Sequence, residues 1–168
     1  MWSRALERGK VTLERGSSQD FATIVRTAYL EPTARLREGR YLASRHAVRA
    51  LMDISDGLST DASRMARASG VDVVLDAAAL VPDPAVAAVA KALGADPMDL
   101  VLNGGDDYEL LTAVEPRAFE HVAGGFAQRF GSPLLRIGKF EVGNGQVWID
   151  RSGKREPLTP SGYDHLRM

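Results

Sequence analysis

The sequence predicts an α/β domain, an α+β layered sandwich, and two patterns carry this prediction. Val48, Ala50, Met52 and Ile54 alternate with mostly polar residues, a period of two that is typical of a strand. Directly downstream, apolar and small residues recur at helical spacing up to Gly70, a residue suited to ending a helix. Strands and helices go on alternating along the chain, which favours layers of both around one core.

Composition narrows the class of protein. The chain has 168 residues, 45% of them apolar, which is enough for one domain with a sizeable core. Its formal net charge is −1, and its early arginines are spread among acids, so no nucleic-acid surface is indicated. The lack of cysteine excludes disulfides and thiol chemistry. No apolar run approaches a membrane span and the start has no secretory signature, so a cytoplasmic protein without a membrane partner is expected.

The other elements follow from prolines, caps and apolar runs. A helix is expected before Pro32, and a second, less regular one after it. Beyond residue 70 the sequence predicts a strand at 71–75, helices opened by Asp83-Pro84 and Asp96-Pro97, a strand ending at Val114, a helix after Glu115-Pro116, and strands at 134–140 and 146–150. The last two are predicted to form a hairpin through Gly143-Asn144-Gly145. Gly124 and Gly125 lie inside the helix expected after Glu115-Pro116 and weaken it by roughly 1 kcal/mol each. The sequence alone does not explain why they are there.

Acidic residues gather at the turn between the strand at 48–54 and the helix that follows it. Asp53 and Asp56 flank this turn at the carboxyl end of a strand, where open α/β sheets tend to bind ligands. Two such carboxylates can share one Mg²⁺, and Ser55 and Gly57 would let a phosphate approach the start of the helix. Spacing alone favours the alternative that Ser55 or Asp56 caps the helix. Asp61 is expected to be an exposed acid of the first helical turn.

A second acidic stretch runs from Asn103 to Leu111 and contains Gly104, Gly105, Asp106, Asp107 and Glu109. Neighbouring acids repel one another unless a cation or a hydrogen-bond donor meets them, and glycines let a backbone lie close to a ligand. This favours a ligand-facing role for Asp106 and Asp107; the alternative is a turn that merely exposes its acids. The histidines lack metal-ligand spacing, no Ser/His/Asp arrangement assigns a catalytic side chain, and the lack of GxxxxGK[ST] excludes a P-loop kinase.

Three stretches resemble the signatures of the thiamine-monophosphate kinase family, and their order and spacing also match. They are Asp53-Ile54-Ser55-Asp56-Gly57-Leu58, Gly104-Gly105-Asp106-Asp107-Tyr108-Glu109-Leu110 and Gly162-Tyr163-Asp164-His165. The resemblance implies the C-terminal domain of the aminoimidazole ribonucleotide synthetase-like superfamily at residues 31–168, after a helical lead-in at 1–30. The family's N-terminal ATP-binding domain is absent from this sequence, so the chain is expected to be a C-terminal half.

The resemblance also implies an activity, the ATP- and Mg²⁺-dependent phosphorylation of thiamine monophosphate to thiamine diphosphate. Such a kinase would need the N-terminal domain, in cis or in trans, and the full-length family is expected to form homodimers. Carried over by position, Asp53 and Asp56 would bind Mg²⁺, Ser55 would contact ATP, and Asp106 and Tyr163 would contact the thiamine phosphate. Asp106 replaces the family's usual glutamate, which shortens its reach, and Tyr163 could equally pack the tail onto the domain. The alternative function is a non-catalytic nucleotide- or metabolite-binding module that keeps the fold.

Overall fold

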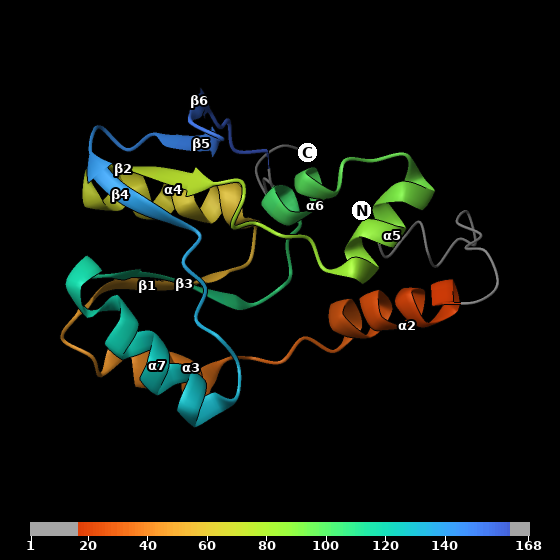
Figure 1. The fold of residues 1–168 in the computed structure, drawn as a ribbon, viewed down its shortest axis with the longest axis horizontal. Coiled ribbons are helices and arrows are strands. Elements are labelled where there is room, and N and C mark those ends of the chain that lie inside the picture. Colours follow the sequence, from red (N-terminus) through yellow and green to blue (C-terminus); the bar gives the residue numbers. More distant parts are fainter. Residues whose placement is uncertain (1–16, 162–168) are drawn as a thin grey trace.

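The computed structural model describes residues 17–161, which form layers of helices and strands. The helices are α2 (Ser17–Leu30), α3 (Leu36–Ala43), α4 (Leu58–Ser69), α5 (Pro84–Leu93), α6 (Pro97–Asn103) and α7 (Phe119–Phe130), with a 3₁₀ turn η1 (Pro116–Ala118) before α7. The strands are β1 (Val48–Ile54), β2 (Val71–Asp76), β3 (Glu109–Val114), β4 (Gly138–Val142), β5 (Val147–Arg151) and β6 (Lys154–Pro157). Helices α3 and α7 cover one face of the antiparallel β1–β3 ribbon, α4 covers its other face, and a four-stranded sheet covers α4 (Figure 1). The layered α+β prediction is confirmed.

Helix α4 is the centre of the main core because it lies between the ribbon and the four-stranded sheet. Leu58, Ala62, Met65 and Ala66 are at most 5% exposed. They pack with residues of β2, β3 and β5, namely Val73, Leu75, Leu111, Val147 and Ile149. Small side chains such as alanine let a helix approach two sheets at once at normal packing density. The helix ends at Gly70 with φ 63°, as its glycine predicts.

The predicted caps of the next two helices are confirmed. The Asp83 carboxylate accepts a hydrogen bond of 2.8 Å from the Ala85 backbone N–H, with Pro84 in the first turn. Asp96 does the same with the Met98 N–H at 2.9 Å, at the start of α6. Such caps fix helix starts because they satisfy backbone donors that have no partner inside the helix.

The hairpin predicted between 134–140 and 146–150 is wrong. The four-stranded sheet has the order β4-β2-β5-β6, so β2 lies between the two strands that were expected to pair. Strand β2 pairs antiparallel with β4 and parallel with β5. The Gly143–Gly145 segment bridges over β2, and the Asp72 carboxylate on β2 holds it through the N–H groups of Asn144 and Gln146 at 2.8 and 2.9 Å. The hairpin that does form joins β5 to β6.

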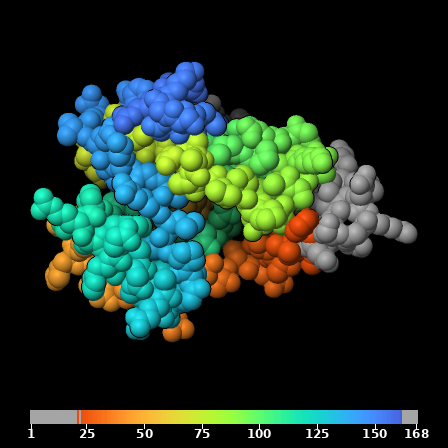
Figure 2. Space-filling view, viewed as in Figure 1, coloured from red at the N-terminus to blue at the C-terminus, as the bar shows by residue number. Residues whose placement is uncertain are grey.

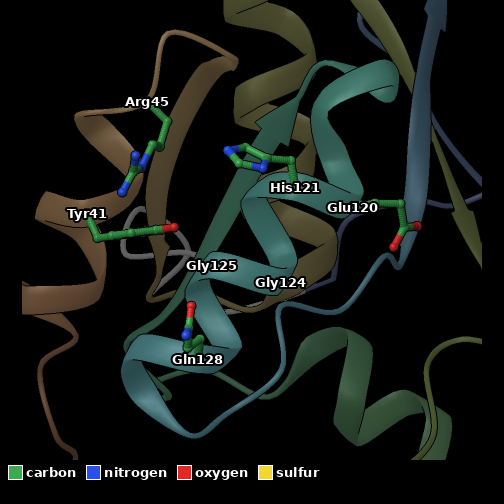
Figure 3. Close-up of a pocket in the computed structure, with 7 residues that line it drawn as sticks. All are labelled: Tyr41, Arg45, Glu120, His121, Gly124, Gly125 and Gln128. Atoms are coloured by element: carbon green, nitrogen blue, oxygen red, sulfur yellow. The ribbon is translucent and has the colours of Figure 1, made fainter.

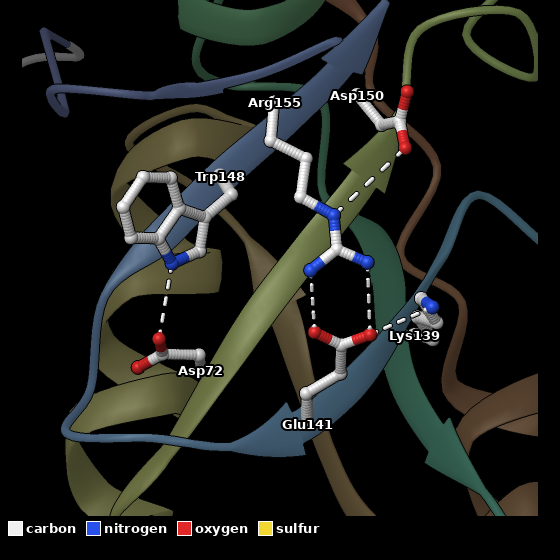
Figure 4. A network of polar contacts seen from close by, with 6 residues as sticks. All are labelled: Asp72, Lys139, Glu141, Trp148, Asp150 and Arg155. Carbon is white, nitrogen blue, oxygen red and sulfur yellow. Dashed lines mark hydrogen bonds and ion pairs between the residues drawn. The ribbon is translucent and has the colours of Figure 1, made fainter. Parts of the chain in front are cut away.

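A polar network crosses the outer face of this sheet (Figure 4). Arg155 on β6 reaches over the sheet to Glu141 on β4 and forms two hydrogen bonds of 2.7 and 3.0 Å. Together with Lys139 it lowers the pKa of Glu141 to about 2. A carboxylate with a depressed pKa stabilises the fold above its unfolded-state pKa, so this contribution is lost as the pH falls from about 4.5 towards 2.

The two glycines inside α7 have different surroundings. A Cβ on Gly125 would meet the Tyr41 phenol oxygen of α3, whereas a Cβ on Gly124 would meet nothing within 4 Å. Gly125 is therefore explained by the close packing of Tyr41 against α7.

Gly124→Ala is expected to raise the free energy of unfolding by about 0.5–1 kcal/mol, because alanine costs less entropy than glycine in a helix interior. Gly125→Ala should give no such gain, since the added methyl must displace Tyr41. Urea unfolding of both variants would check the difference, and equal gains would contradict the packing argument.

Helix α2 completes the fold by packing against α5, and Figure 2 shows the two in contact. Within residues 17–161, no helix has the length and apolar character needed to cross a bilayer.

Candidate functional site

The turn that links β1 to α4 is held from inside by Asp61. The Asp61 carboxylate reaches back over the start of α4 and accepts hydrogen bonds from the Ser55 and Asp56 N–H groups, both at 3.0 Å. Asp61 is 0% exposed, so the expectation of an exposed first-turn acid is wrong. The N-cap is Gly57, and neither Ser55 nor Asp56 caps the helix. Asp61 therefore fixes the backbone of the two residues in this turn that were predicted to bind ligands.

Arg64 joins Asp56 to Asp61. Its guanidinium forms an ion pair with the Asp56 carboxylate through Nη2 and with Asp61 Oδ1 through Nη1, the latter at 2.7 Å. Both carboxylates are buried while the Arg64 side chain is half exposed. Hydrogen bonding to Asp56 is the main cause that raises the pKa of Arg64. Asp56 thus carries a counter-ion from its own domain.

The loop from Asn103 to Tyr108 packs directly on this turn. The Asp106 N–H donates to the Ser55 carbonyl at 2.8 Å, and the Tyr108 N–H donates to the Ile54 carbonyl at 3.0 Å. A Cβ on Gly105 would lie 2.7 Å from the Ser55 oxygen, so this close approach requires glycine. The backbone contacts place the two acidic stretches side by side.

The loop places its acids on the surface in a strained backbone. Asp106 and Tyr108 have φ angles of 68° and 52°, in the left-handed region that non-glycine residues seldom adopt. Asp106, Asp107 and Glu109 are exposed residues. Although the residue as a whole is exposed, the surrounding chain partly shields the Asp107 carboxyl from water. This shielding is the main cause that raises the pKa of Asp107, and the charges of Glu109 and Asp106 raise it further. A bound cation would relieve this crowding of like charges.

Asp53 faces a different part of the molecule. It lines an open groove of about 480 Å³ between α3 and the ribbon. The other lining residues are Ala34, Arg35, Leu36, Gly39, Arg40, Ala43, Leu51, Tyr108 and Leu110. Arg35 closes one side of this groove by a fork of hydrogen bonds to Glu109, the shortest of them 2.7 Å. The groove is largely apolar, and its polar side chains are those of Arg35, Arg40, Asp53 and Tyr108.

The predicted site residues are therefore brought together only in part. Ser55 and Asp106 meet through their backbones where the turn and the loop pack, whereas Asp53 lies on the α3 side of the ribbon and the Asp56 side chain pairs with Arg64 of α4. Tyr163 lies outside the described residues. Within residues 17–161, no three side chains of His, Cys, Asp or Glu converge to hold a metal ion. Carboxylates suit Mg²⁺, which takes one or two from a protein and completes its shell with water and phosphate oxygens.

Sequence reasoning assigned no site role to three residues of this region: Asp61, Arg64 and Tyr108. Tyr108 is 39% exposed and shares the groove with Asp53. Its signal in the sequence was its place inside the acidic, glycine-containing stretch that resembles a family signature. For Arg64 the signal was its position three residues after Asp61 on a helix, a spacing at which opposite charges pair.

A second open pocket, of about 440 Å³, lies between α3 and α7 (Figure 3). Arg45 stacks on the Tyr41 ring there, 4.1 Å from its centroid, and the imidazole of His121 lies across the gap from Arg45. The backbone of Gly124 and Gly125 forms its floor. Among the described residues, none of those predicted to bind ligands lines this pocket.

Comparison with known proteins gives one family and a consistent set of relatives. The model of the family described as AIR synthase related protein, C-terminal domain, matches residues 7–150. The thiamine-monophosphate kinase of Pyrococcus horikoshii is 34% identical over 136 residues, 81% of this chain and 39% of that protein. The Aquifex aeolicus protein of the same name is 30% identical over 157 residues, 92% of this chain and 45% of that protein. The chain thus spans less than half the length of these relatives.

Solved structures agree with this comparison. The structure described as AaThiL complexed with AMPPCP and TMP superposes with a TM-score of 0.73 at 26% identity, over 98% of this chain and 47% of that one. Thiamine-monophosphate kinase from Stenotrophomonas maltophilia gives a TM-score of 0.71 at 30% identity, over 89% and 45% of the two chains. HypE of E. coli, a hydrogenase maturation protein, gives 0.62 at 27% identity, over 76% and 40%. The chain is similar to one half of each.

Proposed function

The chain belongs to the family of AIR synthase related proteins, as their C-terminal domain, and on this basis we propose that it is the C-terminal half of a thiamine-monophosphate kinase. The proposed reaction is ATP-dependent phosphorylation of thiamine monophosphate to thiamine diphosphate. The observation that carries the proposal is the packing of the Ser55–Asp56 turn against the Asp106 loop, in a chain whose relatives bear this name. In the proposed arrangement residues 31–168 form the domain, residues 1–30 lead into it, and an N-terminal domain completes the site and the homodimer.

Each residue of the turn and loop has a proposed role. Asp53 and Asp56 hold Mg²⁺, which supplies charge neutralisation for the phosphates when bound. Ser55 contacts ATP, and Asp61 keeps the Ser55 and Asp56 backbone in position. Asp106 and Tyr163 contact the thiamine phosphate. Phosphoryl transfer depends more on positioning and charge than on covalent help from the protein, so rigid placement of these groups is the domain's main contribution.

One observation favours a second function, a non-catalytic metabolite-binding module of the same fold. Asp56 is already neutralised by Arg64, and Asp53 lies across the ribbon from it. In a module of this kind the carboxylates would serve the fold rather than a metal ion. The two functions differ in whether the acids support turnover.

A chimeric enzyme distinguishes them. This chain would replace the corresponding half of the Stenotrophomonas maltophilia kinase, and formation of thiamine diphosphate from ATP and thiamine monophosphate would be measured. We expect turnover in the chimera and little or none from the chain alone. Asp53→Asn and Asp56→Asn should each reduce turnover by at least about 10–100-fold, the range known for residues that merely support metal ligands.

Glu120→Gln is the control for charge, because Glu120 is an exposed acid on α7, remote from the turn. It should leave turnover unchanged. A folded chimera that makes no thiamine diphosphate, or one whose activity and Mg²⁺ dependence survive both aspartate changes, would contradict the proposed kinase site.

A further inference from the structure

The guanidinium of Arg64 lies against the buried Asp56 carboxylate, the group proposed above to hold Mg²⁺. We propose that Arg64 is the resident counter-ion of Asp56, which holds this carboxylate in the metal-free domain and competes with Mg²⁺ for it. The inference rests on the proposed function, because it takes Asp56 as a Mg²⁺ ligand. It adds a residue outside the recognised signature stretches and a competition that regulates the site.

The first support is the geometry of the pair of carboxylates. Asp56 and Asp61 side chains are 9% and 0% exposed, and Arg64 bridges them from the surface with one nitrogen on each. Two buried negative charges so close together are costly unless a cation meets them. Arg64 is such a cation, and it is supplied by the same helix as Asp61.

The second support is that Asp61 keeps its partners if Arg64 releases Asp56. Asp61 accepts hydrogen bonds from the Ser55 and Asp56 N–H groups through Oδ2, while Arg64 binds its other oxygen, Oδ1. The turn is therefore held in shape independently of the Arg64–Asp56 contact. The half-exposed Arg64 side chain has room in solvent to withdraw from Asp56 while it stays on Asp61.

A competing counter-ion has a consequence that a merely structural ion pair lacks. An Asp56 oxygen cannot serve the guanidinium and a metal ion at once, so the apparent affinity for Mg²⁺ is reduced by the fraction of molecules in which Arg64 is in place. Removal of the guanidinium should lower stability without metal and, at the same time, tighten Mg²⁺ binding. Removal of a residue that only maintains the fold would lower stability without tightening Mg²⁺ binding.

The test is a titration of the full chain with MgCl₂ at constant ionic strength, followed by the amide NMR signals of Ser55, Asp56 and Gly57. Arg64→Gln is expected to lower the dissociation constant for Mg²⁺ by about 2- to 5-fold, the scale of one half-exposed ion pair. Arg64→Lys keeps the positive charge but lacks the two guanidinium nitrogens that bridge Asp56 and Asp61. Its dissociation constant for Mg²⁺ should lie between those of the wild type and Arg64→Gln. Arg64→Lys also provides a folded variant should the glutamine form be unstable.

Arg67→Gln is the matched control, since Arg67 is an exposed arginine in the last turn of the same helix. It should leave the dissociation constant unchanged. If Asp56→Asn abolishes the response but Arg64→Gln and Arg64→Lys bind Mg²⁺ as the wild type does, the competition is refuted and the metal assignment stands. If Asp56→Asn leaves binding unchanged, the assignment of Asp56 to the metal fails, and the competition fails with it.

Discussion

Asp61→Asn is expected to lower the free energy of unfolding by about 2–3 kcal/mol, the value for losing charged hydrogen bonds to buried groups. The amide has one acceptor oxygen where the carboxylate has two. It can serve the Ser55 and Asp56 N–H groups or Arg64, but not both sets as the carboxylate does. Chemical denaturation monitored by circular dichroism would measure the loss.

The control for this change is Asp99→Asn. Asp99 is an acid in the first turn of α6 and is exposed to solvent. Surface substitutions of this kind usually alter stability by less than about 0.5 kcal/mol. Similar losses for the two variants would show that Asp61 acts as an ordinary first-turn acid, contrary to its burial in the structure.

Gly57→Ala is expected to destabilise the domain by about 2–4 kcal/mol, through backbone strain and a steric clash together. Gly57 has φ 103° and ψ 148°, a region of the backbone map that is close to glycine-only. A Cβ there would also lie 3.0 Å from the Asn103 carbonyl carbon and 3.0 Å from the Gly104 oxygen. Both are backbone atoms of the acidic loop, so the methyl group would push the loop away from the turn.

Gly70→Ala is the comparison for a positive-φ glycine without a clash, because Gly70 has a φ of 63°, in the left-handed region, and open space around its Cβ position. It should cost only about 1 kcal/mol, the penalty of the left-handed conformation alone. Thermal unfolding of both variants gives the comparison. If Gly57→Ala were no more costly than Gly70→Ala, the close packing of turn on loop would be refuted.

Local features of this fold could be predicted from the sequence. The period of two in 48–54, the end of α4 at Gly70 and the caps Asp83 and Asp96 each depend on a few neighbouring residues. Such features are set by local sterics and hydrogen bonding, so the chain reveals them without knowledge of its partners.

The arrangement of the last strands could not be predicted in this way. The segment Gly143–Gly145 has the glycine and asparagine of a tight turn, yet it spans the width of β2. Strand order depends on which apolar faces meet over long distances, and β2 is separated from both partners by more than 60 residues. The glycine and asparagine residues of this segment therefore do not indicate that β2 lies between β4 and β5.

The candidate site was predictable as a region but not as a geometry. The strand ends at Ile54, between Asp53 and Asp56, so the alternation that places Asp53 on the α3 side stops before Asp56. The burial of Asp61 could not be predicted either, because the sequence of a first helical turn does not indicate whether its acid faces water or the interior. Its role depends on the path of the backbone around it.

The central position of β2 governs how the domain can be made. This strand leaves the ribosome about 60 residues before either neighbour, since both come from residues 138–151. Until then its two edges have no partner, and unpaired edges invite association with other chains. The domain must therefore fold late in its own synthesis, after nearly all of it has emerged, and its contacts between distant residues place it among slower-folding topologies.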